Sequence, residues 1–366
     1  MVYERVVSDM KFKEKTKYSV LSPTSMGVRL TPYDRQPIHL SNHFGFQATS
    51  AETNVLSPVA SLGLPVKIIT RFVKDSPIAF YIKSDLRKRN IDFEGTEIEQ
   101  AGPWGYRHQF NIADSGYGVR APEVFNDRAG EVGRTISIDD FDLDKIFVQE
   151  GVKILHLSGL IVSLSEQTAQ LCLALVKKAK ETGTKVSFDL NYRPSFWKDR
   201  EKELFPVFQK IASLTDILIG NEEEYQLALG LPGPEIGNEL IHSQIDRYQH
   251  MINELKTHYP NVEIIATTLR DVIDSNRHLF GAMVNHHNEW VVIEQKPIDV
   301  LDRIGGGDGF VGGFLYGLLK GWSVSDATKF GWANGAYAVT LLDDFTTPQN
   351  EEVLWNIWNG NSRVNR

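Results

Sequence analysis

The sequence predicts an α/β protein built around a mostly parallel sheet. From about residue 150, short runs rich in β-branched residues alternate with longer segments of helical periodicity, which is the pattern of successive βαβ units. Polar residues follow the ends of several strand-like runs, and three glycines at 305–307 precede a long apolar helix. Ligands bind beyond the carboxyl ends of the strands in an open α/β sheet, so we expect these polar residues to share one site.

The first 150 residues are less regular than the remainder. Their patterns favour strands or hairpins over 17–30, 43–47 and 106–111, and helices over 50–62 and 78–89. A small sheet inserted at the edge of the α/β core explains this mixture. In an enzyme of this class, such an insertion typically serves as a lid over the ligand.

The second half alternates regularly between the two kinds of element. We expect strands over 152–157, 185–190, 216–219 and 262–268, and helices over 166–180, 243–258 and 324–342. Before the last helix, Gly321 fits a helix stop, and Ser323 with Asp326 three residues later resembles a capping box. The closing pair of helices is expected to cover one face of the sheet.

The turn Gly305-Gly306-Gly307 followed by Asp308 is the most informative stretch of the chain. Glycines adopt dihedral angles closed to other residues, so their N–H groups can converge on one oxyanion at a helix N-terminus, where the helix dipole also favours negative charge. Asp308 would then lie beside the bound anion as a base. The alternative is a tight turn that only allows close helix packing, although such a turn needs fewer glycines and no acid.

The helix after this turn contains four more glycines, at 309, 312, 313 and 317, despite its wide apolar face. Each costs about 0.8–1 kcal/mol relative to alanine, so together they cost about 3–4 kcal/mol. We therefore expect something to approach this backbone closely.

Bulk properties restrict the class of protein. The 366 residues carry 47 acidic and 39 basic side chains, for a net charge of −8, and no basic run stands out, so we expect no nucleic-acid partner. No run of 18 apolar residues occurs, and we expect neither a signal peptide nor a membrane partner. Cys172 is the only cysteine, which rules out an intramolecular disulfide and suits a reducing, cytoplasmic location.

The strand-end clusters and the glycine-rich turn resemble those of the PfkB, or ribokinase-like, family of sugar kinases. Residues 302–314 are similar to the family's C-terminal signature, and Asn221 with Glu224 matches its N-x-x-E element. The following segments further resemble 2-keto-3-deoxygluconate kinases: 126–130, 189–193, 268–270 and 302–308. The resemblance covers residues 18–356 of the sequence.

The resemblance implies a ribokinase-like three-layer αβα fold with a mostly parallel central sheet and a small β-sheet lid. Residues 1–17 would form an N-terminal extension, 18–366 the kinase domain, and 18–48 with 95–128 the lid. Because members of the family often pair through their lids, the resemblance also implies a homodimer.

The implied reaction transfers the γ-phosphoryl group of ATP to a sugar hydroxyl. Asp308 would remove the hydroxyl proton, while the N–H groups of Gly305–Gly307 stabilise charge on the transferring group. Asn221 and Glu224, one helical turn apart, would hold Mg²⁺ and its waters, with Glu224 as the metal ligand, because hard cations prefer oxygen. The residues expected at the nucleotide are Asn191, Asn221, Thr268, Arg270 and Asp344.

A keto-deoxy sugar acid carries a carboxylate, which calls for guanidinium donors. Arg128 and Arg193 are the candidates, supported by Tyr106. Ser50 and Asn54 are expected near the sugar hydroxyls.

Several of these side chains also have an ordinary structural interpretation. Taken alone, Arg193 suits a surface salt bridge, Glu224 the acidic first turn of a helix, and Asp344 a loop acid. Their positions in the family pattern favour the functional interpretation for Arg193 and Glu224, whereas the loop-acid alternative stays open for Asp344.

The sugar end of the site departs from the family pattern. The segment 49–54, Thr-Ser-Ala-Glu-Thr-Asn, keeps Asn54 but lacks the glycines that family members carry before it. Thr24-Ser25 replaces a glycine followed by an acid, and Asn126 replaces a frequent tyrosine. Side chains at 49–51 occupy space that glycine leaves free, so we expect a reshaped sugar pocket.

The leading interpretation is an ATP-dependent kinase for a sugar acid, most simply 2-keto-3-deoxygluconate. The alternatives are a PfkB kinase for another sugar, of fructose or ribose type, and a non-catalytic sensor of the same fold that binds nucleotide or sugar. The base at Asp308 argues against the sensor, because a binding module has no need of one.

Overall fold

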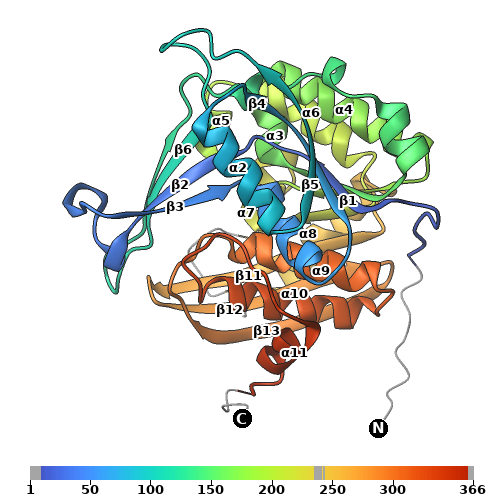
Figure 1. Ribbon diagram of the computed structural model, residues 1–366. Coiled ribbons are helices and arrows are strands. Elements are labelled where there is room, and N and C mark those ends of the chain that lie inside the picture. The colour runs from blue at the N-terminus through green and yellow to red at the C-terminus, as the bar shows by residue number, and fades with distance from the viewer. Residues whose placement is uncertain (1–9, 235–240, 242–243, 362–366) are drawn as a thin grey trace.

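A computed structural model describes residues 10–234, 241 and 244–361 of the chain, which form a large and a small sheet (Figure 1). The strands of the large sheet are β1 (Tyr18–Pro23), β4 (Val66–Val73), β5 (Ile91–Ile98), β8 (Val152–Ser158), β9 (Lys185–Asp189), β10 (Ile217–Gly220), β11 (Ile264–Asp274), β12 (Arg277–His286) and β13 (Glu289–Asp299). The strands of the small sheet are β2 (Gly27–Pro32), β3 (Phe44–Thr49), β6 (Gln109–Asp114) and β7 (Glu123–Asp127).

The large sheet follows the order β13-β12-β11-β10-β9-β8-β1-β4-β5. Neighbouring strands from β11 to β5 pair in parallel, while the β11–β12 and β12–β13 pairs are antiparallel. The expected α/β architecture with a mostly parallel sheet is therefore confirmed. The strand order reverses between β1 and β8, and the crevice at such a switch point is the usual ligand site of an open α/β sheet.

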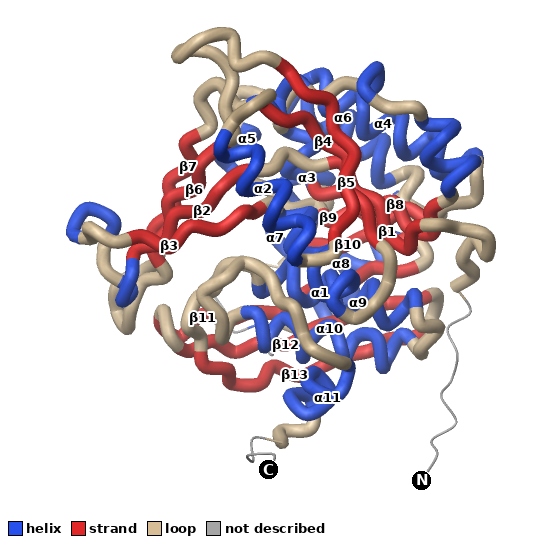
Figure 2. Tube along the Cα trace, in the orientation of Figure 1, coloured by secondary structure: helices blue, strands red, loops and turns tan. Residues whose placement is uncertain are grey.

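Helices cover both faces of the large sheet, which gives three layers (Figure 2). One face carries α1 (Ala51–Ser61), α2 (Pro77–Lys88), α9 (Gly306–Leu319), α10 (Val324–Ala338) and α11 (Glu351–Trp358). The other carries α3 (Gly159–Ser163), α4 (Glu166–Glu181), α5 (Pro194–Trp197), α6 (Glu201–Ala212), α7 (Glu222–Leu229) and α8 (Ile245–His258). Short 3₁₀ turns lie at Tyr33–Arg35, Ile38–Leu40, Val132–Thr135 and Ile138–Asp140, and a π-helix at Lys145–Glu150. None of the helices in the described part of the chain is long and apolar enough to span a membrane.

Adjacent strand residues divide between two hydrophobic cores. Leu155 and Leu218 pack into the core that also contains α4, α6 and α8, whereas their neighbours Ile154 and Ile217 pack with α1, α9 and α10. Successive side chains of a strand point to opposite faces, so a sheet covered on both sides needs unbroken apolar runs. These strands therefore lack polar alternation, and their positions could be predicted from short apolar runs.

The small sheet begins later than expected. Residues 18–23 form β1, which pairs with β4 on one side and β8 on the other, at the centre of the large sheet. The lid expected over 18–48 and 95–128 is therefore wrong at both starting points. The first range includes β1 and the second includes the end of β5, and both strands belong to the large sheet. The small sheet is built from residues 27–49 and 109–127, in the order β3-β2-β6-β7.

Other elements differ from expectation in extent. The strand expected over 106–111 is shifted to β6, and the helix expected to reach residue 342 ends at Ala338. β11 continues to Asp274 and leads into the antiparallel extension β12–β13, which short apolar runs did not indicate. The helix expected over 243–258 is α8, and Ser243 lies outside the described residues.

The N-terminal extension expected over 1–17 lies only partly within the described residues, which begin at Met10. Met10 is buried in the core that contains α1 and α9. Lys13 Nζ donates a hydrogen bond to the carbonyl of Phe147 (2.8 Å). Residues 10–17 therefore pack against the rest of the molecule.

The glycines of α9 allow close contact with neighbouring helices. A Cβ at Gly312 would lie 2.4 Å from the carbonyl oxygen of Val55 in α1, and one at Gly313 would lie 3.0 Å from the Cα of Gly331 in α10. The expected close approach is thus made by α1 and α10 rather than by a ligand. For the body of this helix, the packing alternative is correct.

We predict that Gly312→Ala lowers the free energy of unfolding. Alanine favours a helix by about 1 kcal/mol over glycine, but a forced shift of packed backbone typically costs about 1–3 kcal/mol, so the net change is expected to be a loss. Urea denaturation measures it. Gly45→Ala is the matched control, since its Cβ would meet only the Thr31 carbonyl at an ordinary 3.7 Å. A Gly312→Ala protein at least as stable as the wild type would contradict the packing argument.

Candidate active site

The carboxyl ends of the parallel strands open into a cavity of about 790 Å³. Its walls come from the ends of β9 and β10, from β11, from the start of α9 and from the small sheet. The volume falls in the range of small-molecule sites, roughly 300–1,000 Å³. With the exception of Tyr106, the site residues expected from the sequence all line it: Ser50, Asn54, Arg128, Asn191, Arg193, Asn221, Glu224, Thr268, Arg270, Gly305, Gly306, Gly307, Asp308 and Asp344.

The three glycines of the turn are needed for different reasons. Gly305 has a φ of 82°, and a Cβ there would lie 1.9 Å from the carbonyl oxygen of Asp344. A Cβ at Gly306 would lie 2.8 Å from Val339, so this glycine lets the start of α9 pack against the end of α10. A Cβ at Gly307 would have no neighbour within 4 Å, and Gly307 lines the cavity. The backbone there is open to an anion at the N-terminus of α9.

Asp308 lies on the first turn of α9, at the cavity wall. Asn54 Nδ2, from α1, donates a hydrogen bond to Asp308 Oδ2 (2.8 Å). Burial raises the pKa of Asp308 to about 7, although Asn54 and Arg193 favour the charged form. A general base is most effective when its pKa lies near the working pH, so Asp308 suits proton abstraction from a hydroxyl.

Asn221 and Glu224 form a capping box at the start of α7. Asn221 Oδ1 accepts from the Glu224 N–H (2.9 Å), and Glu224 Oε2 accepts from the Asn221 N–H (2.9 Å). The N-x-x-E spacing therefore fixes both side chains at the cavity rim, with Glu224 Oε1 3.9 Å from Arg193. Burial raises the pKa of Glu224, and Arg193 offsets only part of that increase.

Asp189, at the end of β9, also lines the cavity; the sequence prediction included it in the polar segment 189–193 but gave it no role. Burial raises its pKa well above the ordinary value, and repulsion from Glu224 and Asp308 adds to this. Neighbouring acids favour a cation, but within the described ranges no group of three His, Cys, Asp or Glu side chains could hold a metal ion by itself. Oxygen ligands from phosphates and water would have to complete the coordination of Mg²⁺.

Five arginines line the same cavity: Arg29, Arg128, Arg193, Arg270 and Arg303. Burial lowers the pKa of Arg270 to about 10, and repulsion from Arg303 adds to the effect. Burial likewise lowers the pKa of Arg303, with repulsion from Arg193 next. Guanidinium groups that repel one another gain from a bound polyanion. Arg303 was missed as a site residue, although it lies inside the glycine-rich motif.

Asn191 holds an unusual backbone conformation at the end of β9. Its φ of 39° lies in the left-handed region, which is unfavourable for a residue with a side chain. Its Oδ1 atom is buried without a hydrogen-bond partner in the cavity wall. Strain of this kind concentrates at ligand sites, so the expected contact of Asn191 with a ligand is compatible with its geometry.

Thr24 and Ser25, which depart from the family pattern, form hydrogen bonds with buried acidic side chains. Thr24 Oγ1 donates to Glu52 Oε2 (2.6 Å) on α1. Ser25 Oγ donates to Glu131 Oε1, which also accepts from Arg128 Nη1 (2.7 Å). Part of the hydrogen-bonding capacity of Arg128 is therefore used within the chain.

Two other expected substrate residues also have local partners. Ser50 is the N-cap of α1, where its hydroxyl accepts from the N–H of Thr53 (3.1 Å). Arg193 Nη1 donates to the carbonyl of Tyr192 (2.8 Å), but half of its side chain is exposed. Arg193 is thus the freer of the two arginines expected at the acceptor.

Tyr106 is the expected site residue that the structure places outside the cavity wall. It lies in the loop before β6 and is 37% exposed. Because the strand begins at Gln109, the side chains that reach the cavity are those of Gln109 and Asn111, two residues apart on one face. Gln109 Oε1 and Asn111 Oδ1 are buried without hydrogen-bond partners. In the sequence, the alternation of Gln109 and Asn111 with apolar residues could have indicated a strand with a polar face toward the site.

Gln109 fits only because glycine lies beside it. Gly27 on β2 pairs with Gln109 in the parallel register of the small sheet. A Cβ at Gly27 would lie 2.1 Å from Gln109 Nε2, so any other residue would displace the amide.

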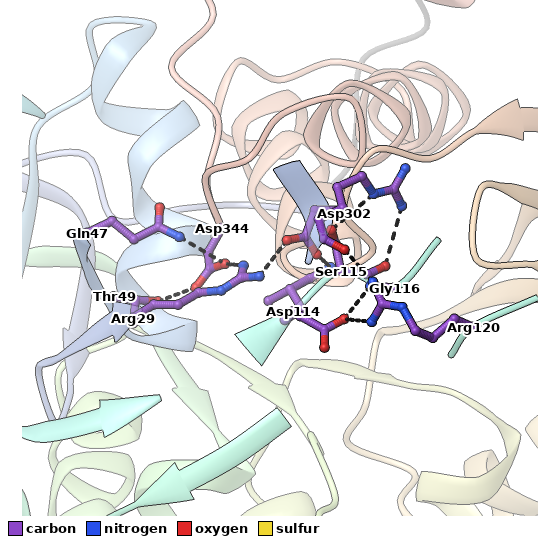
Figure 3. A network of polar contacts seen from close by, with 11 residues as sticks. Arg29, Gln47, Thr49, Asp114, Ser115, Gly116, Arg120, Asp302 and Asp344 are labelled. Carbon is purple, nitrogen blue, oxygen red and sulfur yellow. Dashed lines mark hydrogen bonds and ion pairs between the residues drawn. The ribbon is translucent and has the colours of Figure 1, made fainter. Parts of the chain in front are cut away.

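Asp344 lines the cavity, but its carboxylate already has partners (Figure 3). Thr49 Oγ1 donates to Asp344 Oδ2 (2.7 Å), and Arg29 donates to Oδ1. The expected contact of Asp344 with the nucleotide stays a prediction, because both carboxylate oxygens accept hydrogen bonds within the chain.

A model of the pfkB family of carbohydrate kinases matches residues 20–344 of the chain. The protein belongs to this family, and the expected ribokinase-like fold is confirmed. A 2-dehydro-3-deoxygalactonokinase of Haloferax volcanii is 25% identical over 347 residues, which cover 93% of this chain and 96% of that protein. A 5-dehydro-2-deoxygluconokinase of Clostridium perfringens is 25% identical over 334 residues, covering 90% and 89%. Among solved structures, 2-dehydro-3-deoxygluconokinase of Thermotoga maritima is 26% identical, with a TM-score of 0.85 over 94% of this chain and 100% of that one.

We predict that Asp308→Asn stabilises the fold, and more so as the pH rises. Because the pKa of Asp308 is raised in the folded protein, the wild type loses stability progressively between about pH 4 and 7, as the buried carboxylate becomes charged. The amide of the variant carries no charge at any of these pH values, so the variant does not lose this stability. The melting temperature of the variant should exceed that of the wild type by about a few degrees at pH 8 and by less at pH 5. Asp326→Asn, on the first turn of α10, is the surface control. An advantage that does not grow with pH would contradict the prediction.

We predict that Gly307→Ala separates folding from activity. The added methyl group meets no atom of the protein, and alanine favours a helix by about 1 kcal/mol, so the melting temperature should not fall. The same methyl group would occupy the space in front of the open backbone, and kcat should fall on the order of 100-fold. Steady-state kinetics and a thermal melt on the same preparation measure both effects. Wild-type activity in the variant would show that the anion does not approach Gly307.

Proposed function

We propose that the protein is an ATP-dependent kinase that phosphorylates a hydroxyl group of a sugar acid, specifically 2-keto-3-deoxygluconate. The observation that carries this proposal is the combination of Asp308, with a pKa of about 7, and the open backbone of Gly307 beside it. A protein that only binds nucleotide or sugar has no use for a base at an anion site. The similarity to a 2-dehydro-3-deoxygluconokinase supports the choice of a sugar acid.

The chain's own groups account for the proton and for the developing charge. Asp308 accepts the proton of the acceptor hydroxyl, and its hydrogen bond from Asn54 orients the carboxylate. The N–H groups at the start of α9 stabilise negative charge on the transferring group. ATP, when bound, supplies the phosphoryl group, and Mg²⁺ neutralises part of the phosphate charge.

The charges of the cavity fit ATP and Mg²⁺. Arg270 and Arg303 would pair with phosphate oxygens, which would offset the burial and the mutual repulsion that lower their pKa values. Glu224 and Asp189, whose pKa values are raised, would accept hydrogen bonds from water bound to Mg²⁺. Asn191, Asn221 and Thr268 would contact the nucleotide from the same wall of the cavity.

The acceptor would lie between the small sheet and Asp308. Arg193 would bind its carboxylate, with Arg128 as the second donor. The unpartnered amides of Gln109 and Asn111 would bind its hydroxyl groups.

A neutral sugar is the second candidate acceptor within the same family. It is favoured by the ion pair between Arg128 and the fully buried carboxylate of Glu131, which reduces the positive charge available to a sugar acid. The amides of Gln109 and Asn111 suit the hydroxyl groups of either class.

An ADP-release assay over a panel of acceptors should separate these candidates. The panel contains 2-keto-3-deoxygluconate, its galactonate epimer, 5-keto-2-deoxygluconate, fructose and ribose. We expect turnover with the 2-keto-3-deoxy acids, and a loss of at least about 100-fold in Asp308→Asn because a general base contributes roughly 10²–10⁴-fold. Arg193→Met should raise the KM of the acid acceptor.

Three results of this assay would each refute a different part of the proposal. Turnover of neutral sugars alone would refute the carboxylate roles of Arg193 and Arg128. Nucleotide binding without turnover on any acceptor would refute the kinase proposal itself. Undiminished activity of Asp308→Asn would refute its role as base.

A further inference from the structure

A buried arginine of the small sheet, Arg29, lies between Asp302 and Asp344 (Figure 3). Arg29 lies on β2 with 1% of its side chain exposed, and its guanidinium forms ion pairs with Asp302 and Asp344, whose side chains are 0% and 4% exposed. One guanidinium thus serves two buried carboxylates from distant parts of the sequence. Such a cluster is fixed by its surroundings, unlike an ion pair on the surface.

Both acidic residues contact the glycine turn. Asp302 lies just before it, and Asp302 Oδ1 accepts a hydrogen bond from the N–H of Ile304 (3.0 Å). The backbone carbonyl oxygen of Asp344 lies so close to Gly305 that a Cβ on this glycine would be only 1.9 Å from it. Arg29 is therefore connected, through two acids, to the segments that fix the start of the turn.

The small sheet supplies further partners to Asp344. Thr49 Oγ1 on β3 donates to Asp344 Oδ2 (2.7 Å), and Gln47 Nε2 lies 3.5 Å from Oδ1. In the β2–β3 register, Arg29 lies opposite Gln47. Three side chains of the small sheet thus converge on one acid beside the turn (Figure 3).

The charges of the cluster depend on one another. Burial alone would lower the pKa of Arg29, but Asp344 and Asp302 outweigh it and raise the pKa. Burial raises the pKa of Asp302, and Arg29 offsets part of that increase. Removing the guanidinium would leave two buried carboxylates without their ion-pair partner, which is strongly unfavourable.

We propose that Arg29 is a positioning residue for phosphoryl transfer, which fixes the glycine turn from the small sheet through Asp302 and Asp344. This inference rests on the proposed kinase activity. With this role for Arg29, the small sheet has two functions. It covers the acceptor, and it also holds in place the N–H groups that bind the transferring phosphoryl group. A misplacement of reacting groups by about 1 Å costs on the order of 100-fold in rate.

Kinetics of Arg29→Met and Arg29→Lys test the positioning role. Arg29→Met should lower kcat on the order of 100-fold, while the KM of the acceptor changes by less than about threefold, because the turn acts in the transition state. Arg29→Lys should recover only part of kcat, since an ammonium group cannot reproduce a planar fork between two carboxylates. Equal loss of kcat and acceptor affinity would point to a general disturbance of the cavity and contradict the proposal.

Arg120→Met is the matched control. Arg120 forms an ion pair with Asp114 of the same sheet (2.7 Å), and neither residue lines the cavity. This variant should keep kcat within about twofold of the wild type, because it removes an arginine–aspartate pair without touching the turn. A loss as large as that of Arg29→Met would show that any ion pair of the small sheet has the same effect.

A further variant separates positioning from charge balance. Arg29→Met combined with Asp302→Asn and Asp344→Asn removes the unpaired carboxylates, so the melting temperature should return close to the wild-type value. The value of kcat should stay low, because the small sheet no longer holds the turn. Recovery of both quantities would show that Arg29 only neutralises charge and would overturn the proposal.

Hydrogen–deuterium exchange tests the turn without requiring turnover. Amides of residues 303–309 should exchange at least about tenfold faster in Arg29→Met than in the wild type or Arg120→Met, because local opening becomes easier. Unchanged exchange would overturn the positioning role even in an active enzyme. Faster exchange in a protein without turnover on any acceptor would show that Arg29 fixes the turn but would reject the proposed function.

Discussion

The packing of α9 between α1 and α10 is the constraint on which the candidate site depends. Gly312 brings α9 against the backbone of α1, and the same contact between helices places Asn54 2.8 Å from Asp308. Gly313 brings α9 against α10, whose end lies beside Gly306 of the turn. A side chain at these positions would move Asp308 and the glycine turn together. The hydrophobic core and the geometry of the candidate site are therefore set by the same helix contacts.

The cavity concentrates charges of both signs that the chain balances only in part. Asp189 and Glu224 have raised pKa values, while Arg270 and Arg303 have lowered ones, so each group is in an unfavourable environment for its charged form. Such an arrangement costs folding stability and favours a ligand that carries both a cation and anionic oxygens. A metal–polyphosphate complex has this combination of charges.

The sequence predicted the parts of the structure that depend on local patterns. Apolar runs indicate the central strands, and the glycine turn and Ser323 indicate the starts of α9 and α10. The extension β12–β13 was missed because an antiparallel edge does not show the βαβ alternation on which the prediction rested. The lid boundary was wrong because strand pairing, not local composition, places Tyr18–Pro23 in the large sheet. Strand pairing also begins β6 at Gln109, which leaves Tyr106 outside the cavity wall. Contacts over long separations, such as that of Arg29 with Asp344, leave no periodic signal.

The pairing of Gly27 with Gln109 has a consequence for how this family could diversify. The amide lies in the space that a side chain at position 27 would occupy, so a substitution there has to displace the side chain of Gln109. A larger residue at 27 therefore favours either a shifted Gln109 or a smaller residue at 109, and both changes alter the hydrogen-bonding groups in the cavity wall. Natural variation in acceptor preference should therefore appear as correlated substitutions at these two positions, and redesign of the pocket has to treat them as one unit.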